Sequence, residues 1–307
     1  MINTYLPVYK SLEHEFSKLM FDIHIDDNQL NVYSLKISEL ILRAAVEIES
    51  ISKDLYLLYG GSNSSHIKYD EVAIKHLNKI WSLEKKVIII SSPNCFLTNR
   101  EIYPFIKNEI STGRQKMTFG WNNAYQNIKH DRVNSVAFGS IKYLFDIMAA
   151  LFTLNIYYRD DIFDLGPNMN GSTFSADLGS DIFSVNLHRK GVYDSKMQYN
   201  KQDDLDKSIY VIVMTEKSQN EWDKSNAEMQ RKRSELFAKH PKYIKYISEN
   251  DVTKYTGTNL MRDVLGEEDF KKLFMQAAHS FDGIVNKTFY EAILNKNIIF
   301  PINKNRP

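Results

Sequence analysis

The sequence has little of what disulfide-rich, zinc-binding or membrane-spanning proteins depend on. Its 307 residues include a single cysteine, Cys95, which excludes a disulfide framework and a cysteine-based zinc site and fits a reducing compartment. The first ten residues lack a basic region followed by an apolar core, so no signal peptide is expected. The most apolar stretch, residues 143–158, is shorter than the about 20 residues of a bilayer span. We therefore expect a cytoplasmic protein that neither spans nor binds a membrane.

Several motifs and charge patterns are also missing. There is no Gly-Lys-Ser/Thr phosphate loop and no Gly-x-Ser-x-Gly hydrolase motif. The histidines outside residues 121–132 show no ligand spacing, so we expect neither a metal site nor a cofactor. Lys and Arg total 39 against 38 Asp and Glu. This balance argues against nucleic-acid binding by the whole surface, although a local basic site stays open.

Apolar residues in the first half recur every three or four positions, the period of an amphipathic helix. The clearest case is residues 34–59, where Ser34 is placed to cap the start and Gly60-Gly61 to end the helix. We expect a bundle of four or five helices, with the others at about residues 9–21, 70–90, 119–132 and 135–158.

The composition changes near residue 160. A turn-rich stretch at about 159–172 predicts a linker between a helical domain (1–158) and an α+β domain (173–307). Beyond it, residues 181–189 and 208–214 are strand-like, and a charged helix is expected at about 219–239, ended by Pro241. Helical pieces are expected near Leu260, at 270–281 and at 288–294. The predicted fold class is mainly α, an N-terminal helical bundle followed by a smaller α+β region.

The densest polar cluster is residues 121–132, Trp-Asn-Asn-Ala-Tyr-Gln-Asn-Ile-Lys-His-Asp-Arg. On a helix, Trp121 and Tyr125 fall on an apolar face with Ile128 and Val136. Another face carries a stripe of side chains spaced three or four apart: Asn123, Asn127, His130 and Asn134. Because Asn is a poor helix former, a stripe of Asn indicates selection for something other than a solvated surface.

The cations of this segment lie beside that stripe. Lys129 and Arg132 are three residues apart and neighbours on the predicted helix flank. Side-chain amides, an imidazole that titrates near neutral pH and two cations are suited to holding a phosphodiester or the backbone of a partner. We therefore take Asn127, Lys129, His130 and Arg132 as candidate site residues, expected to line one solvent-reachable cleft.

Residues 124–132 and the apolar helix that follows through Leu151 resemble the final helices of HEPN-type domains. The stretches 39–43 and 47–56 similarly resemble the first long helix of bacterial HEPN-like proteins. The resemblance covers about residues 30–158. It implies a helical bundle that commonly forms a homodimer, and a metal-independent endoribonuclease of a toxin-antitoxin, abortive-infection or CRISPR defence system. The usual catalytic motif of the family is an Arg, a polar residue and then a His, with four to six residues between Arg and His.

The sequence departs from that motif. Arg132 is followed by Val133 with no His in the next six residues. Lys129-His130 occupies the place of the family's Arg-polar pair, but Ala137 or Phe138 then stands where the second His is expected. The literal spacing occurs only between Arg233 and His240, outside the resembling region. The site therefore either uses a variant set or is catalytically silent.

If the variant set is active, the resemblance implies attack of a ribose 2′-hydroxyl on the adjacent phosphate. His130 would transfer the proton, Lys129 and Arg132 would stabilise the phosphoryl oxygens, and Asn127 would orient the phosphate or the imidazole. Supporting positions are Asn123, Asp131, Arg43 and Glu47.

Structural roles compete with these. His130 can be an ordinary surface or core histidine, Arg132 can pair with Glu47 or with groups near Asp131, and Arg43 and Glu47 can simply pair with each other. Two functions follow. The first is an RNA-cleaving effector whose partners are RNA and an antitoxin or defence-system protein. The second is a non-catalytic HEPN-like dimerisation module that binds a partner protein or a nucleotide.

Overall fold

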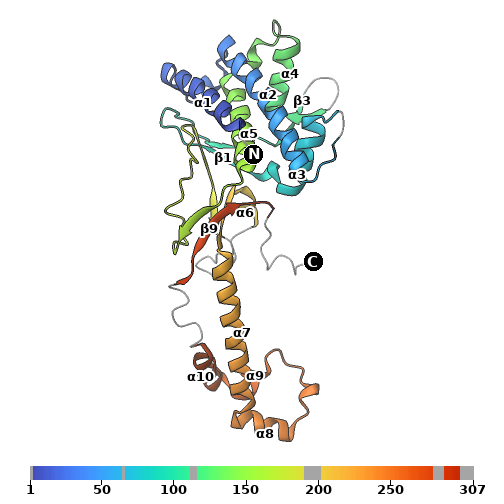
Figure 1. Ribbon diagram of the computed structural model, residues 1–307, viewed down its shortest axis with the longest axis vertical. Helices are drawn as coiled ribbons and strands as arrows, with labels where there is room; N and C mark the ends of the chain where they lie inside the picture. The colour runs from blue at the N-terminus through green and yellow to red at the C-terminus, as the bar shows by residue number, and fades with distance from the viewer. Residues whose placement is uncertain (1–2, 64–65, 111–115, 190–201, 279–286, 298–307) are drawn as a thin grey trace. The chain divides into compact units, whose positions relative to one another are not determined.

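The computed structural model describes residues 3–63, 66–110, 116–189, 202–278 and 287–297 (Figure 1). The structure is 58% helical and 13% strand, which confirms the prediction of a mainly helical chain. The helices are α1 (Tyr5–Asp22), α2 (Leu35–Leu58), α3 (Ile74–Trp81), α4 (Gly120–His130), α5 (Ile141–Arg159), α6 (Gln202–Lys207), α7 (Glu216–Ala238), α8 (Pro241–Glu249), α9 (Leu260–Leu265) and α10 (Glu267–Ala278).

Shorter elements connect the helices. A π-helical turn, η2 (Tyr69–Ala73), precedes α3, and 3-10 turns occupy η1 (Gln29–Asn31), η3 (Leu83–Lys85), η4 (Val136–Phe138) and η5 (Val252–Lys254). The strands are β1 (Ile88–Ile90), β2 (Glu101–Ile102), β3 (Lys107–Ile110), β4 (Lys116–Phe119), β5 (Phe163–Gly166), β6 (Phe183–Val185), β7 (Leu187–Arg189), β8 (Tyr210–Met214) and β9 (Tyr290–Leu294).

Among the described residues the strands form three sheets. One has the order β2-β1-β6, one is the antiparallel β3-β4 hairpin, and the third has the order β5-β9-β8-β7 with β7 parallel to β8. The strands β6, β7 and β8 confirm the strand-like runs predicted at 181–189 and 208–214. The sequence predicts only helices for the first half of the chain, so β1 to β4 are a correction. Ser82 takes a left-handed φ of 52° and ends α3, and the β-branched run at 88–90 pairs as a strand where a helix was expected.

The chain forms two compact units. The first comprises Met1–Asp164, Asn170–Val213 and Ala292–Pro307, and the second comprises Leu165–Met169 and Met214–Glu291. The structure thus groups Asn170–Val213 with the first unit, whereas the sequence predicts one domain over residues 173–307. The physical reason is strand pairing, because β6 lies antiparallel to β1 with Ile89 opposite Ser184.

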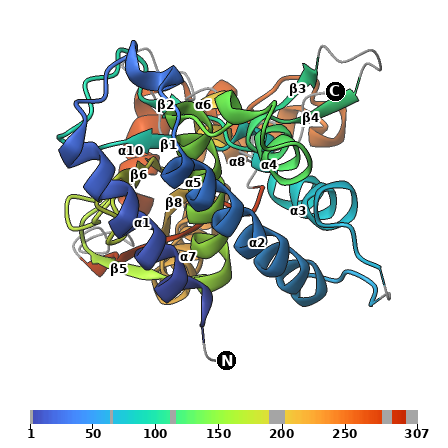
Figure 2. The same ribbon diagram turned by 90° about the horizontal axis from the view of Figure 1, so that it is seen from above.

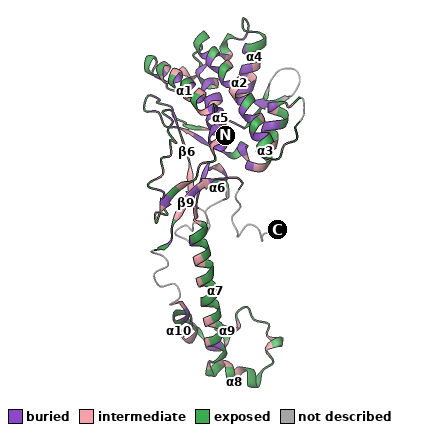
Figure 3. Cartoon of the chain, in the orientation of Figure 1, coloured by how far each residue is buried: buried purple, intermediate pink, exposed green. Residues whose placement is uncertain are grey.

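The core of the first unit is α5, which lies among α1, α2 and α4 (Figure 2). Every residue of α5 from Ile147 to Tyr157 is buried, and Figure 3 shows the helix largely in the buried colour. The amphipathic helix α2 packs its predicted apolar stripe on α5, and Ser34 accepts a hydrogen bond from the Ile37 amide as the expected cap. In the described parts of the chain, no helix is both long and apolar enough to cross a membrane.

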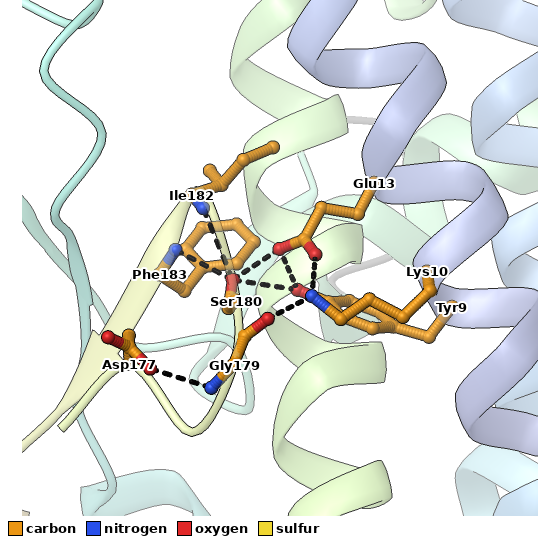
Figure 4. Close-up of polar contacts among 8 residues, drawn as sticks. All are labelled: Tyr9, Lys10, Glu13, Asp177, Gly179, Ser180, Ile182 and Phe183. Atoms are coloured by element: carbon orange, nitrogen blue, oxygen red, sulfur yellow. Dashed lines mark hydrogen bonds and ion pairs between the residues drawn. The ribbon is translucent and has the colours of Figure 1, made fainter. Parts of the chain in front are cut away.

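A buried polar cluster holds α1 to the segment that precedes β6 (Figure 4). The Glu13 carboxylate, 1% exposed, accepts hydrogen bonds from the hydroxyls of Tyr9 (2.8 Å) and Ser180 and from the ammonium of Lys10 (2.7 Å). The Ser180 hydroxyl in turn accepts from the Phe183 amide at 2.9 Å. Burial, with the nearby Glu13 charge, raises the pKa of Tyr9 well above its usual value. The buried side chains drawn there are bonded to one another, as a stable interior requires.

The second unit is built on α7, which ends before Pro241 as expected. It begins at Glu216, after the cap residue Thr215, somewhat before the predicted start at about residue 219. Its small core contains Phe237, Leu265 and Leu273. The predicted helix over 288–294 is wrong, because Tyr290–Leu294 forms β9. The end of the predicted helix at 270–281 lies partly outside the described residues.

Candidate functional site

The inner face of α4 consists of Trp121, Ala124, Tyr125 and Ile128, all buried. The Trp121 indole donates to the Pro104 carbonyl at 2.8 Å and stacks on Phe119 with centroids 5.3 Å apart. The predicted apolar face is therefore correct, except that Val136 lies beyond the helix and is 44% exposed. Packing of this face on α2 and α5 fixes which side of α4 meets solvent.

The first half of α4 also buries a polar side chain. Asn122 is 3% exposed. Its oxygen accepts from the Tyr69 hydroxyl at 2.5 Å, and its nitrogen donates to Asp70 at 3.2 Å and to Thr118 at 3.4 Å. Burial, with the charge of Asp70, raises the pKa of Tyr69. One asparagine of the polar cluster, Asn122, therefore has a structural role: its hydrogen bonds join α4 to η2.

The predicted stripe is present where α4 is helical. The Asn127 amide nitrogen donates to the Asn123 carbonyl at 2.8 Å and to the Asn123 side-chain oxygen at 3.0 Å. Both side chains are half-buried. Because these donors of Asn127 bind its own helix, the expected role in orienting a phosphate would require the side chain to turn outward.

The helix ends at His130, short of the expected end at Arg132. The Asp131 amide closes the last turn on the Asn127 carbonyl at 2.9 Å, and Asp131 itself has left helical geometry. Its carboxylate accepts from the side-chain nitrogen of Asn134 at 3.0 Å and from the Asn134 amide at 3.3 Å. The helical placement of Arg132 and Asn134 is therefore wrong, and both residues belong to the turn that follows α4.

Three exposed groups follow one another at this end of α4. Lys129, His130 and Arg132 are all exposed, and the Lys129 ammonium lies 5.3 Å from the centroid of the Tyr125 ring. Within the described part of the chain, none of the three forms an ion pair. The alternative pairing of Arg132 with Glu47 or with groups near Asp131 is not found there, and the carboxylate of Asp131 is engaged by Asn134.

Arg132 lines a pocket of about 170 Å³ between the start of α2 and the end of α4. The Ser34 amide donates to the Gly139 carbonyl and the Ile141 amide to the Val32 carbonyl, which holds residues 32–34, before α2, against residues 139–141, at the start of α5. A methyl group at Gly139 would force the Ser38 side chain to move, so the close approach depends on glycine. Of the four candidate residues, Arg132 is the one that lines this pocket. Its other lining residues are Tyr33, Ser34, Leu35, Ser38, Ile128, Ser135 and Val136.

The supporting positions on α2 interact with each other. Burial raises the pKa of Glu47, and the nearby charge of Arg43 opposes that shift in part. Arg43 is exposed and Glu47 half-buried. No hydrogen bond joins either residue to Lys129, His130 or Arg132 in the described regions.

In the second unit, where Arg233 and His240 have the spacing of the family motif, the histidine has a structural role. His240 is the cap residue of α8, and its Nδ1 accepts from the Lys242 amide at 3.2 Å. No group of three or more His, Cys, Asp or Glu side chains that could hold a metal is present among the residues that the structure describes.

Comparison with protein-family models, with curated proteins and with solved structures gave no match to this chain.

Proposed function

We propose that this chain is a metal-independent endoribonuclease-type effector of a prokaryotic defence or toxin-antitoxin system, acting in the cytoplasm. The observation that carries the proposal is the exposed group of Lys129, His130 and Arg132, which has no ion-pair partner among the described residues. Cations that are not neutralised by the protein are available to a phosphate. The HEPN resemblance of the surrounding helices supports the same interpretation.

In the proposed reaction the 2′-oxygen of a ribose attacks the adjacent phosphorus while His130 accepts the hydroxyl proton. The bond from phosphorus to the 5′-oxygen breaks, and that oxygen receives a proton, leaving a 2′,3′-cyclic phosphate and a 5′-hydroxyl. Lys129 and Arg132 would offset the charge that develops on the phosphoryl oxygens. Proton removal and proton delivery call for two groups, whereas one chain supplies one imidazole here.

A second copy of the chain would supply the second imidazole. Large apolar side chains beside the site are exposed: Tyr33 (53%), Leu35 (68%), Val133 (85%) and Val136 (44%). Tyr33, Leu35 and Val136 line one pocket with Arg132, and exposed apolar side chains gathered in this way are typical of an interface. This surface supports a homodimer in which the ends of two α4 helices form one cleft.

The dimer can be tested by placing charge on that surface. Leu35→Glu with Val133→Glu should convert a dimer to a monomer in light scattering at micromolar concentration and remove RNA cleavage with it, because burying two carboxylates is costly. Val46→Glu, on an exposed part of α2 about three turns away, should leave the dimer intact. A parent protein that is monomeric at that concentration would contradict the composite site.

Cleavage is tested with purified protein, total RNA and EDTA, followed by sequencing of the 5′-hydroxyl ends. His130→Ala should reduce cleavage by about 100-fold or more, the usual contribution of a general base. The matched control is His66→Ala, an exposed histidine on a different loop, which should cut as the parent does. If the parent cuts no RNA, the catalytic proposal is wrong.

A second function is favoured by the bonding of Asn127 to Asn123 and by the missing second His. It is a non-catalytic HEPN-like dimerisation module that binds a partner protein, such as an antitoxin, or a nucleotide. It predicts a dimer without RNase activity and without toxicity on expression.

A further inference from the structure

The first unit contains a larger pocket, whose lining includes Phe119, the residue that precedes α4. It has a volume of about 860 Å³ and lies between η2 and α3 on one side and the start of the β3-β4 hairpin on the other. Figures 1 and 2 both draw α3 and this hairpin next to each other. The volume is in the range of pockets that bind small molecules. The lining includes Val72, Ile74, Phe105, Ile106 and Phe119, which make most of its surface apolar.

The walls of this pocket are fixed by contacts outside it. Phe105 and Phe119 are 2% and 3% exposed and meet edge to face with centroids 6.0 Å apart. Phe119 is paired with Lys107 across the hairpin and stacks on Trp121. On the opposite wall, η2 is held by Asn122 through Tyr69 and Asp70. The cavity is therefore formed before any ligand arrives, so binding needs little reorganisation.

The charged groups of the pocket are not equally available. Glu71 forms an ion pair with Lys68 at 2.8 Å, and Glu84 accepts from the side chain of Asn78. Lys75 is exposed on α3 and has no ion pair in the described residues, and the Lys107 ammonium lies 5.2 Å from the Phe119 ring centroid without a carboxylate partner there. With Glu71 paired to Lys68, the lining keeps two ammonium groups, of Lys75 and Lys107, and one carboxylate, of Glu84, which the neutral Asn78 amide does not neutralise. The charge left for a ligand is therefore positive on balance, at the edge of an apolar cavity.

We propose that this pocket binds a small organic anion with an apolar body, of the size of a medium-chain fatty acid. The carboxylate would lie between Lys75 and Lys107, and the hydrocarbon would cover Ile106, Val72 and the edges of the two phenylalanine rings. A charge-assisted contact to two ammonium groups fixes the orientation, and burial of the chain supplies the affinity. The site is independent of the cations at the other end of α4.

The test is calorimetric titration of the full chain with decanoate and with its uncharged analogue decanamide. Decanoate should bind with one site per chain, and decanamide about tenfold or more weakly, since a lost charge-assisted hydrogen bond is worth about a factor of ten. Lys75→Glu with Lys107→Glu should weaken decanoate by at least that factor. Ile106→Asp, which changes the apolar wall at an exposed position, should do the same.

The matched control is Lys79→Glu, an exposed lysine of α3 that does not line the pocket. It should bind decanoate as the parent does. The proposal is overturned if the parent shows no decanoate binding at millimolar concentration, or if the control weakens binding as much as the pocket variants do. Circular dichroism of each variant, with the parent helix signal retained, keeps these outcomes separate from unfolding.

Discussion

The two ends of α4 differ in how their polar side chains are bonded. Near its start, Asn122 is buried and bonded to Tyr69, Asp70 and Thr118. At its end, Lys129, His130 and Arg132 are exposed and have no ion pair within the described regions. Asn127, between them, is bonded to its own helix. A run of polar residues that looks like one motif thus contains two kinds of position, and only the bonding of each side chain separates the structural kind from the kind available to a ligand.

From this difference we expect the largest change in the stability of the protein when the buried Asn122, near the start of α4, is replaced. Asn122→Ala should lower the free energy of unfolding by about 2 to 3 kcal/mol, because it leaves the Tyr69 hydroxyl and other buried groups without a partner. Urea denaturation followed by circular dichroism measures the change. Asn127→Ala is the matched control, an asparagine on another face of the same helix, and it should cost less than about 1 kcal/mol as surface changes usually do. Equal losses for the two variants would break the distinction between the ends.

A smaller effect is expected at Asp146, beside the first residue of α4. A methyl group at Gly120 would lie 3.5 Å from its carboxylate. Burial raises the pKa of Asp146 to about 6 from 3.8, and Lys142 opposes the shift in part. A carboxyl whose pKa is higher folded than unfolded binds its proton more tightly in the folded state, so its ionisation destabilises the fold as pH rises through about 6.

Asp146→Asn should therefore stabilise the protein by about 1 to 2 kcal/mol at about pH 7. The advantage should shrink as pH falls from about 7 to about 4, because the native carboxyl then becomes neutral as well. Thermal melts of parent and variant across that pH range give the difference. A constant difference at every pH would mean that Asp146 stays ionised in the fold and that its charge is accommodated.

Much of the helical framework is predictable because local signals agree there. The stripe and cap of α2 place it to within a residue, and Pro241 marks the break between α7 and α8. The strands β1 and β9 resemble helical segments in sequence, because short apolar runs suit both periods and the partner strand decides. Ile88–Ile90 becomes a strand by pairing with β6, a segment far away in the sequence, and no local pattern carries that information.

The candidate site shows the same division. The apolar face of α4 follows from spacing, and the burial of Trp121 and Tyr125 confirms it. The end of the helix at His130 does not follow, because neither Asp131 nor Arg132 is a helix breaker. It is set by the bonds of Asp131 to Asn134, which form only once the chain has turned. The structural role of Asn122 likewise depends on Tyr69 and Asp70, which lie far earlier in the sequence.

The most direct test of the functional site pairs RNA cleavage with urea denaturation on the parent, His130→Ala and Asn122→Ala. We expect His130→Ala to lose cleavage by about 100-fold or more while its free energy of unfolding stays within about 1 kcal/mol of the parent. We expect the opposite for Asn122→Ala, which should lose much of its stability but retain cleavage under conditions in which it remains folded. A parent without RNase activity, or a His130→Ala variant that loses cleavage only as it unfolds, would contradict the claim that the exposed end of α4 is the functional site.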